Sequence, residues 1–169
     1  METEMVQGRV VIVAGSPADM AHVDAIQRAL SSFGIISVVR IASAHKTPLR
    51  LLEIISRYEA EEIPTVYITV AGRSNALSGL VDAATPFPVI ACPPPSEQWA
   101  MVDIWSSLRM PSGVAPALIL DPDNAALFAA KLFALENIEL RRRVTSFQKQ
   151  NADRLAEEDD KVMKAGHAE

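Results

Sequence analysis

A histidine and a lysine stand side by side at His45 and Lys46, between a β-branched run and a segment with an apolar stripe. The run at residues 37–41 predicts a strand, and residues 49–61 predict a helix. Such a strand-to-helix turn lies at the carboxyl edge of a parallel sheet, where open α/β sheets bind ligands. An imidazole beside a fixed positive charge suits acid–base chemistry on an anionic ligand. A solvated loop with an incidental histidine is the alternative interpretation.

Two further strand-to-helix turns carry glycine and polar residues at the same predicted edge. They are Gly15, Ser16 and Asp19 in the first turn, and Gly72, Arg73, Ser74 and Asn75 in the third. Ser16 and Asp19 have the spacing of a helix capping box, but they could also bind a phosphate and sugar hydroxyls, respectively. An N-cap beside an exposed arginine is the structural alternative for the third turn. Adjacent first and third strands would bring all three turns within one ligand's length.

The elements that must position these turns follow from the hydrophobic pattern. Apolar or β-branched segments predict strands at residues 9–14, 37–41, 65–70, 87–91 and 115–120. Helices are predicted at residues 18–33, 49–61, 97–108 and 123–137, with a short one that ends near residue 84. Thr47 is a good N-cap for the second of these helices, with Pro48 at its first position.

Strands that alternate with helices imply right-handed crossovers and a three-layer α-β-α sandwich. We expect a flavodoxin-like parallel sheet of five strands in the order 2-1-3-4-5, which is the commonest arrangement for that number. Residues 1–138 would form this α/β unit within a single-domain protein.

The last segment, residues 139–169, differs in composition from the α/β unit. It carries seven basic and seven acidic residues, and Leu140, Val144 and Phe147 fall at helical spacing. This pattern predicts a long polar C-terminal helix. The helix is either a solvated tail or a helix laid across a neighbouring subunit.

The composition of the 169-residue chain excludes several classes of protein. A net charge of −5 argues against a nucleic-acid binder. The single cysteine, Cys92, excludes a disulfide framework and a multi-cysteine metal site, and indicates a reducing compartment. The start of the chain has no signal-peptide pattern, and no apolar run reaches the roughly 20 residues that span a membrane. We therefore expect a cytoplasmic protein that does not bind a membrane.

The ordered set of motifs resembles that of the 5-aminoimidazole ribonucleotide carboxylases of purine biosynthesis. The resemblance spans about residues 9–138, and the matching segments are residues 14–19, 43–48, 71–75, 86–93, 105–108, 110–114 and 124–126. One class of the family is a mutase that moves a carboxylate from the ring amine, N5, to the ring carbon, C4. The other class carboxylates the aminoimidazole directly with CO2.

Two turns separate these classes in the resemblance. The mutases typically read Ser-Ala-His-Arg-Thr-Pro in the second turn and Gly-Gly-Ala-Ala-His in the third. This chain has Lys46 in the second turn and Gly72 followed by Arg-Ser-Asn in the third, so it is similar to the direct carboxylases. Ala18 is a departure, because a serine that contacts phosphate is common there.

The resemblance also implies an assembly and a chemistry. It implies a homo-oligomer, commonly an octamer, that acts on a ribonucleotide and CO2 without biotin, ATP or a metal. The aminoimidazole is an enamine, so its C4 is already nucleophilic. The protein must therefore hold the ribonucleotide, keep CO2 away from water and move one proton. A mutase, or a non-catalytic module that senses nucleotides, are the alternatives.

The roles of individual residues follow from the same resemblance. His45 would remove the C4 proton after carboxylation, and Lys46 beside it favours the neutral imidazole that can accept this proton. The expected substrate contacts are Ser16, Ser43 and Lys46 for phosphate, Asp19 for ribose, Arg73, Ser74 and Asn75 for the CO2 end, and the Gly15 and Gly72 backbone. Lys46 could belong to the CO2 end instead.

Overall fold

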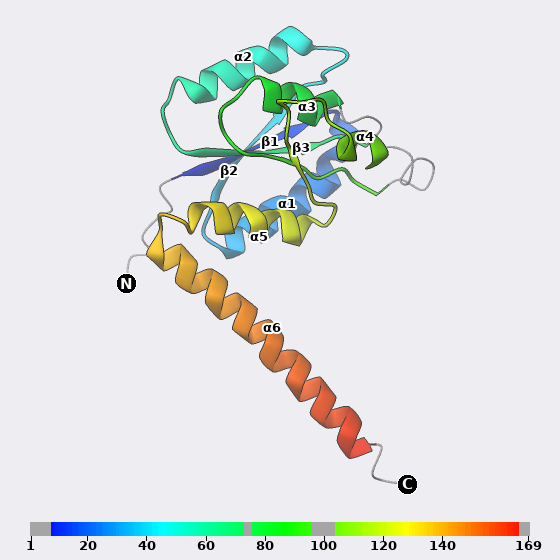
Figure 1. The fold of residues 1–169 in the computed structure, drawn as a ribbon, viewed down its shortest axis with the longest axis vertical. Helices are drawn as coiled ribbons and strands as arrows, with labels where there is room; N and C mark the ends of the chain where they lie inside the picture. The colour runs from blue at the N-terminus through cyan, green and yellow to red at the C-terminus, as the bar shows by residue number, and fades with distance from the viewer. Residues whose placement is uncertain (1–7, 73–75, 96–103, 166–169) are drawn as a thin grey trace.

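The computed structural model describes residues 8–72, 76–95 and 104–165. Five parallel strands form one sheet in the order β2-β1-β3-β4-β5 (Figure 1), which confirms the expected flavodoxin-like order. The strands are β1 (Arg9–Ala14), β2 (Ile36–Ile41), β3 (Thr65–Val70), β4 (Val89–Ala91) and β5 (Ala117–Leu118).

Helices cover both faces of this sheet (Figure 1). They are the 3-10 helix η1 (Pro17–Asp19) and the α-helices α1 (Met20–Ser32), α2 (Pro48–Glu59), α3 (Ala76–Ala83), α4 (Ile104–Leu108), α5 (Pro122–Phe133) and α6 (Ile138–Ala165). The result is the predicted three-layer sandwich with a long C-terminal helix. None of the helices in the described ranges is both long enough and apolar enough to cross a membrane.

Strands β1 and β3 are buried at every position because helices lie against both of their faces. Successive side chains of a strand point to opposite faces. On β1, Val10 and Ile12 pack in the cluster that contains α1 and α5. Val11 and Val13 pack in the second cluster, with α2 and α3. The central strands therefore join the two halves of the core.

Strands β4 and β5 are shorter than predicted, and prolines account for their starts. Pro88 accepts a hydrogen bond from Tyr67 N at 2.9 Å but has no N–H to donate, so β4 begins at Val89 rather than at residue 87. Pro116 likewise precedes β5, which was expected to begin at residue 115. The hydrophobic pattern continues through these prolines, whereas the hydrogen-bonded ladder does not.

Helix starts also differ from the prediction. The helix expected from residue 18 consists of the short η1 followed by α1 from Met20. Thr47 stands at the N-cap of α2, but its side chain makes no capping hydrogen bond there. Helix α5 begins at Pro122, and Asp121 is its N-cap, with its carboxylate accepting from Asn124 N.

Helix α6 leaves the body of the protein after its first turns (Figure 1). Leu140 and Val144 are buried in the α1 and α5 side of the core. The Phe147 ring meets the Phe33 ring edge-on, with 5.4 Å between their centres. Beyond this contact the helix is exposed except at the half-buried Asn151, and Leu155 and Val162 carry apolar side chains into solvent.

Candidate active site

The three turns meet at the carboxyl edge of the sheet because β1 lies between β2 and β3. Backbone hydrogen bonds continue past the strand ends and join the turns. Gly15 N donates to Val70 O at 2.8 Å, and Ala42 N donates to Ala14 O at 3.0 Å. The expected adjacency of the first and third strands is confirmed, so the first turn lies between the other two.

A cleft of about 630 Å³ opens among these turns, a size typical of small-molecule sites. Its lining residues are Gly15, Ser16, Ala18, Asp19, Ser43, Ala44, His45, Lys46, Ala71, Gly72, Leu77, Pro94 and Pro95. Seven of these were candidates from the sequence. The other three candidates, Arg73, Ser74 and Asn75, lie outside the described residues.

One wall of the cleft was missed by sequence reasoning. Pro94 and Pro95 follow β4, whose neighbour in the sheet is β3. Neither proline was among the candidate residues from the sequence. Their position after a predicted strand could have placed them at the same edge as the three turns.

The first turn forms the capping box that its spacing predicts. Asp19 Oδ2 accepts from Ser16 N at 3.0 Å and from Ser16 Oγ at 3.2 Å, and Ser16 Oγ accepts from Ala18 N at 3.2 Å. The other oxygen, Oδ1, lies toward the third turn, where a β-carbon added to Gly72 would be 3.5 Å away. The capping and ligand-binding interpretations are therefore compatible, because each uses a different oxygen.

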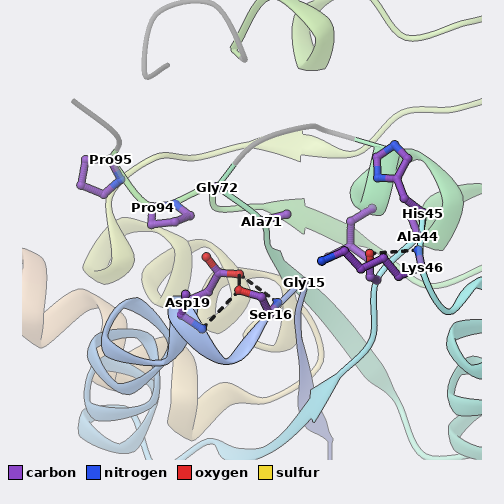
Figure 2. Close-up of a pocket in the computed structure, with 13 residues that line it drawn as sticks. Gly15, Ser16, Asp19, Ala44, His45, Lys46, Ala71, Gly72, Pro94 and Pro95 are labelled. Atoms are coloured by element: carbon purple, nitrogen blue, oxygen red, sulfur yellow. Dashed lines mark hydrogen bonds between the residues drawn. The ribbon is translucent and has the colours of Figure 1, made fainter. Parts of the chain in front are cut away.

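The second turn is held by its own side chains. Thr47 Oγ1 accepts from Ser43 N at 2.9 Å, and Ser43 Oγ accepts from Lys46 N at 3.3 Å. These bonds fix the backbone while the His45 and Lys46 side chains remain exposed. In Figure 2 the Lys46 side chain extends from this turn toward the first turn, and the His45 ring lies farther from it.

Glycines keep the space between the turns open. A β-carbon at Gly15 would lie 3.3 Å from Ala71 Cβ, and one at Gly72 would lie 3.3 Å from Pro94 Cγ. Both distances are tighter than most real contacts between such atoms. A larger residue at either position would therefore push the walls of the cleft apart or fill it.

The order of these turns along the chain is that of a known family. The model of the AIR carboxylase family matches residues 9–154. The chain belongs to this family. The match runs past residue 138, where the resemblance inferred from the sequence ends, and so includes part of α6.

Relatives of this AIR carboxylase family member cover nearly its whole length. A phosphoribosylaminoimidazole carboxylase of Treponema denticola is 49% identical over 155 residues, which are 92% of this chain and 98% of that relative. One of Archaeoglobus fulgidus is 51% identical over 154 residues, which are 91% and 84% of the two chains. The crystal structure of Treponema denticola PurE matches with a TM-score of 0.89, at 49% identity and over 92% and 98% of the chains.

Longer animal enzymes match over a part of their length. The mouse bifunctional phosphoribosylaminoimidazole carboxylase/phosphoribosylaminoimidazole succinocarboxamide synthetase is 47% identical over 131 residues. The match covers 78% of this chain and 31% of the mouse enzyme. These likenesses agree with the resemblance inferred from the turns.

Two titratable groups that do not line the cleft have shifted pKa values, the buried Cys92 and the half-buried His22. Burial, helped by the charge of Asp121, raises the pKa of the Cys92 thiol to about 12. Burial also lowers the pKa of His22, and this effect outweighs the opposing influence of Asp19, the Cys92 backbone and Asp121. Both side chains are therefore neutral near pH 7. Among the described residues, no group of three or more His, Cys, Asp or Glu side chains could hold a metal ion.

The Asp19→Ala variant distinguishes a capping role of this carboxylate from a role in substrate binding. If Oδ1 holds the ribose hydroxyls, Asp19→Ala should raise the KM for the ribonucleotide more than tenfold, because hydrogen bonds to a charged group contribute about 1.5–3 kcal/mol. Loss of the cap alone costs only about 1 kcal/mol of stability. Steady-state kinetics and melting temperature should be measured together. An unchanged KM with a lower melting temperature would leave Asp19 as a cap only.

Proposed function

We propose that this protein adds CO2 to C4 of 5-aminoimidazole ribonucleotide, a step of purine biosynthesis, and forms the 4-carboxy ribonucleotide. The observation that carries the proposal is the meeting of the three motif-bearing turns at one cleft. Membership in the AIR carboxylase family supports it. The reaction is expected to be reversible and to need no ATP, biotin or metal, because the enamine carbon is nucleophilic without activation.

His45 would carry the proton transfer. The lone pair of the ring amine pushes the C4–C5 π pair of the enamine onto the carbon of CO2. A carbon–carbon bond forms, one C=O π pair moves to oxygen, and the amine nitrogen becomes an iminium. C4 then bears both a hydrogen and the new carboxylate. Neutral His45 accepts that hydrogen as a proton, and its bonding pair restores the aromatic ring. In reverse, the imidazolium returns the proton to C4 and CO2 leaves.

The remaining candidate residues would hold the substrate. Ser16, Ser43 and Lys46 are proposed to bind the phosphate, and Asp19 the ribose hydroxyls. The extension of the Lys46 side chain toward the first turn (Figure 2) supports a phosphate there. Gly15 and Gly72 would let the substrate approach the backbone. Arg73, Ser74 and Asn75, outside the described residues, are proposed for the CO2 end.

Direct carboxylation and the mutase reaction differ in how CO2 arrives. We expect carboxylation of aminoimidazole ribonucleotide in bicarbonate buffer without ATP, at a rate that follows dissolved CO2. The N5-carboxylated compound should react only after it releases CO2, because Arg73 and Asn75 add bulk and hydrogen-bond donors where the mutase pattern has Gly and Ala-His, which changes the room for an N5 carboxylate. The measurement supplies each substrate with labelled carbon, with and without carbonic anhydrase to exchange the free CO2.

Two outcomes would contradict this proposal in different ways. Retention of the N5 label in the product, without exchange into the CO2 pool, would identify a mutase and leave the cleft assignment intact. Binding of the ribonucleotide with no turnover of either substrate would identify a non-catalytic module that senses nucleotides.

Assembly is the second part of the proposal. Trp105 and Leu49 are 63% and 75% exposed in the single chain, and Leu155 of α6 is 67% exposed. Large exposed apolar side chains of this kind often mark subunit contacts. We propose a homo-oligomer, as an octamer, in which α6 lies across a neighbour. Trp99, which belongs to the same predicted helix as Trp105, lies outside the described residues.

Light scattering tests the assembly. The expected mass is eight times the 18.3 kDa of one chain, because burial of the exposed apolar faces favours closed symmetric assemblies. Leu155→Glu should weaken the assembly by placing a charge in a contact, whereas Lys161→Glu, on the same exposed helix, serves as the charge control. A stable monomer at micromolar concentration would contradict the proposal.

The expected location is the cytoplasm, in keeping with the single reduced cysteine.

A further inference from the structure

A side-chain bridge joins two walls of the cleft from behind. His22 Nε2 lies 3.4 Å from Cys92 Sγ, although the two residues are 70 positions apart in the chain. His22 belongs to the first turn of α1 and follows Asp19 by three residues. Cys92 directly follows β4 and precedes Pro94 by two residues. The bridge therefore connects the segment that carries Asp19 with the segment that carries Pro94.

The hydrogens of this bridge can be assigned from its partners. The Cys92 thiol is protonated, and its Sγ donates to Leu120 O at 3.7 Å. The sulfur lone pairs are then left to accept, so the hydrogen between the two side chains belongs to His22 Nε2. The negative charges of Asp19 and Asp121 also act on this imidazole and oppose the lowering of its pKa by burial. The arrangement uses a neutral His22 and a neutral Cys92.

The bridge bears on the part of the cleft where its walls are closest. A β-carbon at Gly72 would meet Pro94 Cγ at 3.3 Å and Asp19 Oδ1 at 3.5 Å, so these two groups flank the same narrow space. A small separation of α1 from the segment after β4 would widen this space. It would also move Asp19 Oδ1 relative to a bound ligand.

We propose that His22 is a positioning residue that holds the Asp19 turn against the Pro94 wall and thereby sets the affinity for the ribose of the substrate. The inference rests on the proposed function, since it assumes that the ribose lies beside Asp19. His22 does not line the cleft, so it acts through Asp19 and not on the reacting atoms. Its loss should weaken substrate binding without slowing the chemical step.

A pair of His22 variants tests this role. His22→Leu removes the donor, and the KM for the ribonucleotide should rise about five- to tenfold, the scale of one lost hydrogen bond, while kcat stays within about twofold. His22→Gln places an amide N–H near the position of Nε2 and should restore most of the affinity. An unchanged KM in His22→Leu, or a failure of His22→Gln to restore it, would overturn the proposal.

Variants of Cys92 provide a second test of the bridge between His22 and Cys92. Cys92→Ala should raise KM, but by no more than His22→Leu does, because the Cys92 backbone can still accept from His22. The double variant should match His22→Leu, because the imidazole is one partner of both contacts. Additive effects on KM would contradict the bridge. If His22→Leu does not fold, the KM values of Cys92→Ala and Cys92→Ser still test the bridge. The serine hydroxyl keeps an acceptor for His22, so Cys92→Ser should show the smaller rise in KM.

Two controls separate the possible failures. Val23→Ala removes two fully buried methyl groups at the next position of α1, so it should lower the melting temperature and leave KM unchanged. If Val23→Ala raises KM as much as His22→Leu, the effect is general loosening of α1 and the proposal fails. Absence of turnover in the unmodified protein would instead refute the proposed function itself.

Discussion

Replacement of His45 with asparagine is expected to reduce kcat by about 10²–10⁴-fold, the contribution typical of one general acid–base group. Asparagine is close in size to histidine and polar, but it lacks a nitrogen that can accept a proton. His45 is exposed at a turn whose hydrogen bonds involve Ser43 and Thr47, so the fold should be unaffected. The loss should appear in both the carboxylation and the decarboxylation direction, since the same proton moves in each.

The control for His45→Asn is substrate affinity. KM for the ribonucleotide and the melting temperature should stay near their original values, because the variant removes only a group that touches C4 and its proton. Turnover close to that of the unmodified protein would remove His45 from the mechanism. A loss of affinity alone would reassign it to substrate binding.

Removal of the Lys46 charge should have the next largest effect. Lys46→Met keeps the unbranched shape of the side chain and all but one atom of its length. The value of kcat/KM should fall about 10- to 100-fold, as expected when one hydrogen bond to a charged group of about 1.5–3 kcal/mol is lost. The pattern of the loss identifies the partner of the ammonium. A rise in the KM for the ribonucleotide places the ammonium at the phosphate. A rise in the KM for CO2, measured at saturating ribonucleotide, places the ammonium at the CO2 end.

Arg50 offers a matched control for Lys46. It lies in the first turn of α2, near the same turn, but its guanidinium pairs with Glu53 at 2.9 Å on an exposed surface. Arg50→Gln removes a neighbouring positive charge that does not line the cleft, and exposed pairs of this kind contribute little. An equal loss in both variants would mean that Lys46 acts only through the general field of the protein.

Much of the fold was predictable because β1 and β3 lie at the centre of the sheet. Both of their faces are covered, so their sequences are continuous apolar or β-branched runs with matching bounds. The edges of the sheet were less predictable. At Pro88 and Pro116 the apolar pattern continues while backbone donors are missing, and strand ends depend on those donors.

The candidate site was predictable to the extent that it is local. Ser16 and Asp19 are three residues apart and form the expected capping box, and the turn that carries His45 and Lys46 is a short segment between two elements. Contacts between distant segments could not be inferred in this way. The pairing of His22 with Cys92 depends on how α1 lies beside the end of β4, for which the spacing of residues gives no signal.

The position of α5 late in the chain has a consequence during synthesis on the ribosome. All three turns of the cleft precede residue 76 in the chain. Strands β1, β2 and β3 can pair once β3 has left the ribosome. However, Val23, Ile26 and Leu30 of α1 are covered by the alanines of α5, at residues 125–130. A nascent chain that ends before α5 would thus carry a nearly complete substrate cleft and an uncovered apolar helix. Such an intermediate is prone to aggregation, so chaperone protection is most needed while the central third of the chain is translated.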